Sequence, residues 1–206
     1  MAEKNVIPLL FGTYIENCIN LGLEYSIDKI PVSLYTLESV GLDLGFSSSA
    51  SGIVVLEHIK DEDKIRVIEN HLIEKGDPNQ IVNLCWDIWK RNGFMNTLFF
   101  IDGSNRAMVN LLKIRWDEPL TWETSQTFGP NTKIRPVNFS TEHKDMLSNL
   151  HAIISKGYLA IPKEHDKLLT SLRTAYAKEL DLQKDQTSYN DLLDGLRLSM
   201  KGYCIK

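Results

Sequence analysis

Aspartate residues stand in three short apolar segments of this sequence, where an isolated ionised carboxylate is costly to bury. Asp43 lies in an apolar stretch that alternates as a strand does and is followed by a turn of small residues. Asp102 ends the apolar run 97–101, and Asp191 and Asp194 lie in a leucine-rich segment near the C-terminus. A metal ion, a basic side chain or a ring of hydrogen-bond donors could neutralise each carboxylate. Three such segments in one chain predict a metal centre.

The chemistry of that centre follows from its all-oxygen ligands. Mg²⁺ binds oxygen in octahedral geometry and keeps several waters, so a few carboxylates suffice to hold it. Asp191 and Asp194 are three residues apart, so on a helix they face the same side and repel each other unless a cation lies between them. Two ions roughly 4 Å apart activate a water and stabilise the leaving oxygen of a phosphodiester. The pattern therefore favours metal-dependent phosphodiester hydrolysis.

Other roles are open for each carboxylate taken singly. Asp43 could cap its turn, or the turn could bind ATP phosphates as in sugar kinases and actin. Asp102 could be the N-cap of a helix that starts near residue 105. Asp194 could pair with Arg197 or Lys201 along one helix. The kinase alternative requires two lobes and a second glycine-rich loop, and neither is visible in about 200 residues.

The elements that position these residues alternate between strands and helices. Strands are expected at 38–45, 51–59, 64–73, 97–101, 133–138 and 158–161. Helices are expected from Asp77 to about 92–93, and over about 105–114, 141–155, 162–180 and 188–202. Pro136 confines its strand to a sheet edge, and the loop 121–129 is irregular. This order predicts an α/β fold with a mixed central sheet and helices on both faces.

Charge is unevenly distributed along the 206 residues. Residues 1–130 hold 11 Lys/Arg against 18 Asp/Glu, a balance of −7, whereas residues 131–206 hold 12 against 9, a balance of +3. The basic excess of this second segment comes from Lys133, Arg135, Lys163, Lys167, Arg173, Lys178 and Lys184. If the phosphodiester belongs to DNA, four of them are expected to contact its phosphates, and we call these the candidate DNA-binding residues: Lys163, Lys167, Arg173 and Lys178. A solvated helix face would give the same charge pattern, so charge alone does not decide.

The remaining composition is that of a globular protein in a reducing compartment. Hydrophobic residues make up 43% of the chain, and no apolar run approaches the roughly 18 residues of a membrane span. The three cysteines are widely spaced and form no CxxC pair, which argues against a zinc site or a disulfide framework. Residues 1–36 are predicted to form an N-terminal appendage with a short amphipathic helix.

The three carboxylate segments together resemble a known family. The sequence around Asp43, Asp102 and Asp191 is similar to the C-terminal nuclease domain of the large terminase subunit of tailed viruses, especially forms from archaeal viruses and proviruses. Its anchors are Gly41–Ser49, Phe100–Asn105 and Asn190–Arg197, with a further likeness at Lys167–Ala175. The resemblance spans roughly residues 38–203 and implies an RNase H-like fold for residues 37–206.

The resemblance also implies a function and a ligand set. It implies an endonuclease that cleaves double-stranded DNA during genome packaging, with Mg²⁺ or Mn²⁺ as cofactor, in the host cytoplasm. Asp43, Asp102 and Asp191 match the metal-ligand triad, and Asp194 matches a supporting acidic position. Where many relatives have His-Asp or Asp-Asp before the last helix, this chain has Tyr189-Asn190.

The motor half of such terminases has no counterpart in this sequence. No G-x-x-x-x-G-K-[ST] motif is present, so the chain resembles the nuclease half alone, and residues 1–36 resemble the linker to the ATPase. A terminase ATPase domain and other packaging proteins are the implied partners. A non-catalytic DNA-binding or assembly module on the same fold remains an alternative.

Overall fold

The protein is described here by a computed structural model. It describes Phe11, Ile15, Glu16, Ile19 and residues 38–45, 49–59, 64–91, 97–117, 134–178 and 180–203. The strands are β1 (Glu38–Asp43), β2 (Ser51–Ile59), β3 (Lys64–Ile73), β4 (Thr97–Asp102), β5 (Ile134–Val137), β6 (Leu159–Ala160), β7 (Ala177–Lys178) and β8 (Asp181–Leu182). The helices are α2 (Pro78–Arg91), α3 (Arg106–Asp117), α5 (Phe139–Ser155), α6 (Asp166–Thr174) and α7 (Asn190–Ser199), with 3₁₀ turns η3 (Lys184–Gln186) and η4 (Met200–Gly202).

Six of the strands form one mixed sheet in the order β5-β4-β1-β2-β3-β6. The first three strands pair antiparallel as a meander, because short turns join them in the sequence. β4 pairs parallel to β1, β5 pairs parallel to β4, and β6 pairs parallel to β3. The prediction of a mixed central sheet is confirmed, and β5, which contains Pro136, lies at its edge as predicted.

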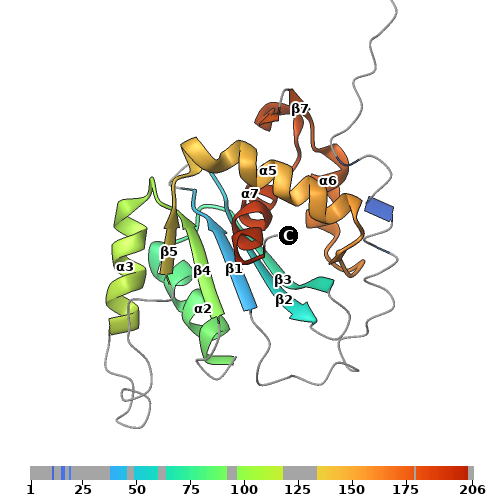
Figure 1. Ribbon diagram of the computed structural model, residues 1–206. Coiled ribbons are helices and arrows are strands. Elements are labelled where there is room, and N and C mark those ends of the chain that lie inside the picture. Colours follow the sequence, from blue (N-terminus) through green and yellow to red (C-terminus); the bar gives the residue numbers. More distant parts are fainter. Residues whose placement is uncertain are drawn as a thin grey trace, which may run out of the picture.

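Helices cover both faces of this sheet, as the sequence predicted (Figure 1). Because side chains alternate along a strand, Val40 and Leu42 of β1 pack with α2 and α3 on one face. Val54 and Leu56 of β2 point to the other face, where they pack with α5, α6 and α7. The positions of Gly41 and Asp43 in β1 therefore face α7.

The C-terminal part of the chain corrects one prediction. The helix expected over 162–180 ends at Thr174, where Ala175 adopts an extended conformation. A short antiparallel pair, β7 and β8, follows, and Leu180 between them has a positive φ of 62°. The backbone N–H of Gln183 donates to the carbonyl of Tyr176 at 2.9 Å, so tertiary pairing replaces further helical hydrogen bonds.

Two predictions fall mainly outside the described residues. Most of the short helix and linker predicted for 1–36 lies there, although Phe11 and Ile15 are buried in the same core as α5 and α6. The predicted loop 121–129 lies there entirely. Within the described ranges, no helix combines the length and the apolar character needed to cross a bilayer.

Candidate metal centre

The two strand aspartates lie at the carboxyl ends of neighbouring strands and on the same face of the sheet. Leu42 of β1 is the register partner of Ile101 of β4, and Asp43 and Asp102 come directly after them on parallel strands. Leu42 and Ile101 both pack on the α2–α3 face, so the next residue of each strand points to the opposite face. Asp43 and Asp102 are therefore placed at the carboxyl ends of neighbouring strands, facing the side of α7.

Glycines let α7 approach this edge at very short range. A Cβ added at Gly41 would lie 1.9 Å from the carbonyl oxygen of Gly195, and one added at Gly52 would lie 2.0 Å from that of Asp191. Both distances are below any real contact, so only glycine fits these strand positions. Gly52 is the register partner of Asp43. The first turn of α7 is thus held directly beside Asp43.

Burial and like charge raise the pKa of Asp43. Desolvation contributes most to the increase, which takes the pKa from 3.8 to about 8, and the charges of Asp194, Asp191 and Asp102 also raise it. The ammonium of Lys184 lowers the pKa in part. The pKa of Asp191 is also raised, chiefly by burial. Asp43 thus interacts electrostatically with all three other candidate carboxylates, two of them on α7 and one on β4.

Asp194 is fully buried and contacts two cations. Its Oδ1 accepts a hydrogen bond from Arg197, and its Oδ2 lies 2.7 Å from the ammonium of Lys184. The pairing with Arg197 that was considered from the sequence is present, whereas Lys201 binds Glu142 at 2.6 Å. The sequence marks Lys184 only as one of several basic residues, because no spacing predicts its contact with Asp194.

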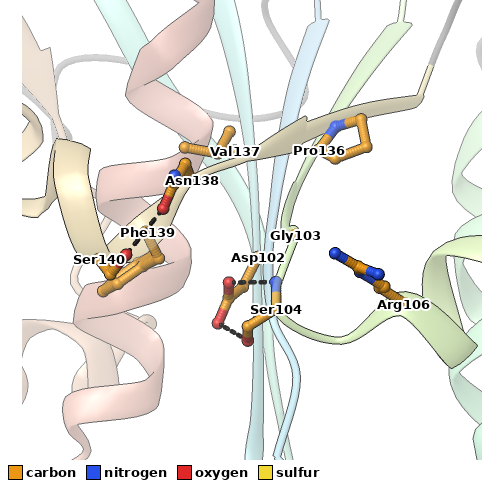
Figure 2. A pocket seen from close by; sticks show the side chains of 9 residues that line it. All are labelled: Asp102, Gly103, Ser104, Arg106, Pro136, Val137, Asn138, Phe139 and Ser140. Carbon is orange, nitrogen blue, oxygen red and sulfur yellow. Dashed lines mark hydrogen bonds between the residues drawn. The ribbon is translucent and has the colours of Figure 1, made fainter.

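The carboxylate of Asp102 is turned toward its own loop. Its Oδ1 accepts a hydrogen bond from the backbone N–H of Ser104 at 2.9 Å, and its Oδ2 accepts one from the Ser104 hydroxyl at 2.8 Å. These residues line an open cavity of about 650 Å³ between the start of α3 and the start of α5, as Figure 2 shows. Arg106 also lines the cavity and is exposed. A cationic side chain therefore stands beside Asp102 at the surface.

A second cavity, of about 350 Å³, lies on the other side of the candidate centre. It is lined by Asp191 together with Tyr189, Lys75 and residues from the turn before β2. The ammonium of Lys167 lies 5.9 Å from the centre of the Tyr189 ring. Lys167, one of the candidate DNA-binding residues, is therefore next to a ring that lines the same cavity as Asp191.

The other three candidate DNA-binding residues are exposed but have no such link to the centre among the described contacts. Lys163 precedes α6, and Lys178 is on β7. Arg173, in the last turn of α6, forms an exposed ion pair with Glu16 at 3.1 Å.

The donor set fits a hard divalent cation in chemistry, although the side chains do not converge on one point. Asp43, Asp102, Asp191 and Asp194 offer only oxygen, and burial together with the neighbouring carboxylates raises the pKa of Asp43. In the described part of the chain, no three His, Cys, Asp or Glu side chains are grouped closely enough to hold a metal ion. Asp102 and Asp194 are instead engaged by Ser104, Arg197 and Lys184.

Comparison with solved structures places this fold among terminase nucleases. The large terminase nuclease of thermophilic phage G20c matches with a TM-score of 0.66 and 16% identity, over 96% of this chain and 100% of that one. The large terminase nuclease domain of bacteriophage SPP1, solved with bound manganese, matches with a TM-score of 0.56 and 13% identity, over 81% and 86% of the two chains. The chain has the RNase H-like α/β fold of these nuclease domains, as the sequence predicted.

Further comparisons set the limits of this likeness. The large terminase of another thermophilic bacteriophage matches with a TM-score of 0.60 and 9% identity, over 88% of this chain but 44% of that one. The G20c nuclease has also been solved with bound magnesium, zinc and cobalt. No protein-family model and no curated protein matches the sequence. At these identities the likeness concerns the fold.

Proposed function

We propose that this protein is a metal-dependent endonuclease that cleaves double-stranded DNA, as in viral genome packaging by the large terminase subunit. One observation carries the proposal: Asp43 and Asp102 end neighbouring parallel strands on the face that α7 covers, and Asp191 of α7 packs on Gly52, the register partner of Asp43. Open α/β sheets bind their ligands at the carboxyl ends of strands. The likeness in fold to terminase nucleases, several solved with divalent metals, supports the same conclusion.

In this proposal Asp43, Asp102 and Asp191 are the catalytic metal ligands, and Asp194 is a fourth carboxylate of the same centre. Bound Mg²⁺ or Mn²⁺, as a pair of ions, would supply an activated water and stabilise the leaving oxygen of the phosphodiester. Asp43 is the central ligand, because it interacts with each of the other three. Asp102 would be the ligand from β4 once its carboxylate is free of Ser104, whose two contacts with it are local and exposed.

The DNA is held by cationic side chains around the centre. Lys167 is the best supported of the four candidates, because it lies beside the Tyr189 ring that lines the cavity with Asp191. Lys163, Arg173 and Lys178 extend the basic surface of the same C-terminal segment. Contacts of this kind go to phosphates, so affinity is little dependent on sequence and falls steeply with salt.

The protein acts in this proposal with a terminase ATPase domain and with other packaging proteins, as a viral or proviral protein of archaeal type in the host cytoplasm. One of the matching large terminases is covered over less than half of its length, which supports the idea that a motor is supplied separately or by further sequence. Residues 1–36 are the proposed linker to that motor.

The main alternative is a non-catalytic DNA-binding or assembly module on the same fold. Both functions retain the carboxylates and the basic residues, so the distinction rests on cleavage. The ATP-binding alternative has less support, since the structures that match are nucleases rather than two-lobed kinases.

Nicking of supercoiled plasmid DNA tests the proposal. The wild type is expected to nick in Mn²⁺ or Mg²⁺ and to be inactive in EDTA, and Asp43→Ala is expected to be inactive in both. Asp87→Ala is the matched control, because Asp87 is an exposed aspartate of α2 on the opposite face of the sheet. DNA binding without metal-dependent nicking by the wild type would favour the non-catalytic module instead.

A further inference from the structure

Lys184 is a cation that lies inside the proposed metal centre. Its ammonium is 2.7 Å from Oδ2 of Asp194, a side chain with 0% of its surface exposed. It also interacts with Asp43, where its charge opposes the rise in the carboxylate pKa. An ammonium in this position supplies part of the positive charge that a divalent ion would otherwise bring.

Another cation could replace Lys184 at Asp194. Asp194 keeps Arg197 on its other oxygen, so loss of Lys184 does not leave the buried carboxylate without a counter-charge. The Lys184 side chain is 53% exposed, so water can replace its contact with Oδ2. Arg197, by contrast, is 1% exposed and also donates to the carbonyl of His143 at 3.4 Å. The lysine is therefore the exposed partner of Asp194, and the arginine is the buried one.

The backbone that carries Lys184 is anchored, so only the side chain needs to move. Lys184 begins the 3₁₀ turn η3, and its carbonyl accepts a hydrogen bond from the side-chain amide of Asn190 at 3.2 Å, at the first residue of α7. Its ammonium also lies 5.9 Å from the ring of Phe139, which lines the cavity beside Asp102. A lysine that leaves Asp194 has solvent and this open cavity next to it.

We propose that Lys184 is a built-in counter-ion that competes with the divalent metal for Asp194, so that metal binding releases the ammonium from the carboxylate. The proposal rests on the metal centre proposed above and adds a residue that sets its affinity. In the metal-free protein Lys184 neutralises Asp194, and in the loaded protein like charge drives it away from the bound ion. Its side chain then remains at the mouth of the cavity beside Asp102.

Metal affinity of the purified chain tests this, without reference to cleavage. Mn²⁺ binding is measured by calorimetry and by the decrease of the free-ion paramagnetic resonance signal, for the wild type, Lys184→Met, Lys184→Arg and Lys90→Met. Lys90 is an exposed lysine in the last turn of α2, on the opposite face, so its variant matches the change in net charge. Lys184→Met is expected to bind Mn²⁺ on the order of tenfold more tightly, and the arginine and Lys90 variants to stay near wild type.

Thermal melting gives a second reading of the same competition. In EDTA, Lys184→Met should melt below the wild type, because Asp194 and Asp43 have lost a counter-ion, and saturating Mn²⁺ should reduce that difference. Lys184→Gln, which keeps the length and a polar end, replaces the methionine variant if the latter does not fold.

The outcomes separate the two proposals. If the wild type takes up no Mn²⁺, the metal centre fails and this inference fails with it. If the wild type binds Mn²⁺ and Lys184→Met binds it equally or more weakly, the centre stands but the competition is refuted. Weaker binding in that variant would instead make Lys184 a positioning residue that orients Asp194 toward the metal.

Discussion

Replacing Asp43 by asparagine in the metal-free protein is expected to stabilise the fold, although it removes a central residue of the proposed site. Asparagine has nearly the same shape, carries no charge and does not titrate in this range. In the wild type, burial and three neighbouring carboxylates raise the pKa of Asp43 from 3.8 to about 8. Keeping this carboxylate ionised near neutral pH therefore costs the folded protein free energy.

The sign and size of the effect follow from the raised pKa. A carboxyl whose pKa is higher in the folded state stabilises the fold fully below about pH 3.8, and this contribution is lost as the pH rises toward about 8. Each pH unit in that window changes the free energy of unfolding by at most about 1.4 kcal/mol. Water and the half-exposed Lys184 screen the charge, so we expect about 1–2 kcal/mol between pH 5 and 7.5. For a chain of this size, that is roughly 3–6 °C in melting temperature.

Melting curves in EDTA and in Mn²⁺ measure the effect. Asp43→Asn should melt above the wild type at pH 7.5 in EDTA, equal it near pH 4, and gain little from Mn²⁺, whereas the wild type gains stability from Mn²⁺. Asp87→Asn, on the exposed face of α2, controls for the change in net charge. A variant that unfolds, or that melts below the wild type at pH 7.5, would show that Asp43 has a favourable structural partner. Equal wild-type melting in Mn²⁺ and EDTA would count against a metal centre.

Three further substitutions test how the centre is built. Gly52→Ala should move α7 away from the sheet and weaken Mn²⁺ binding, measured by calorimetry, because a Cβ there would lie 2.0 Å from the α7 backbone. Arg197→Met should destabilise the fold by about 3–5 kcal/mol in chemical denaturation, since it removes the fixed partner of the fully buried Asp194. Lys167→Glu should reduce plasmid nicking at moderate salt while leaving Mn²⁺ binding intact. Arg173→Glu, at the far end of α6 and already paired with an acid, should reduce nicking less.

Much of the sheet was predictable, because its strands carry a strong local signal. The alternating apolar residues of β1 and the continuous apolar runs of β2 and β4 lie close to the strands observed. The placement of Asp43 beside Asp102 follows from the parallel pairing of β1 with β4, which the prediction of a mixed sheet did not specify. Pro136 likewise predicted an edge strand, because proline has no backbone N–H to donate to a neighbouring strand.

The contacts around α7 were not predictable, because they depend on tertiary packing. Lys184 is in a segment that sequence periodicity leaves unassigned, and it reaches Asp194 only because β7 and β8 turn the chain back after α6. The predicted helix over 162–180 was wrong beyond Thr174, although apolar residues at helical spacing continue past that residue. The hairpin of β7 and β8 replaces the helix there, and the N–H of Ser188 donates to the Thr174 hydroxyl at 2.9 Å. Gly41 and Gly52 look like ordinary strand glycines until α7 is placed against them.

The structure gives different answers for Asp43 and Asp102 to the question whether the carboxylate only caps a turn or a helix. A carboxylate that caps a turn or a helix accepts hydrogen bonds, which hold its pKa down. Asp102 does accept two from Ser104, but the N–H of Met108 in the first turn of α3 donates to Asn105 instead, so Asp102 is not the helix cap. Asp43 does not have the environment of a capping carboxylate, because burial and like charges raise its pKa. In such an environment a carboxyl either takes up a proton or binds a cation, so metal binding at Asp43 is the property to measure first.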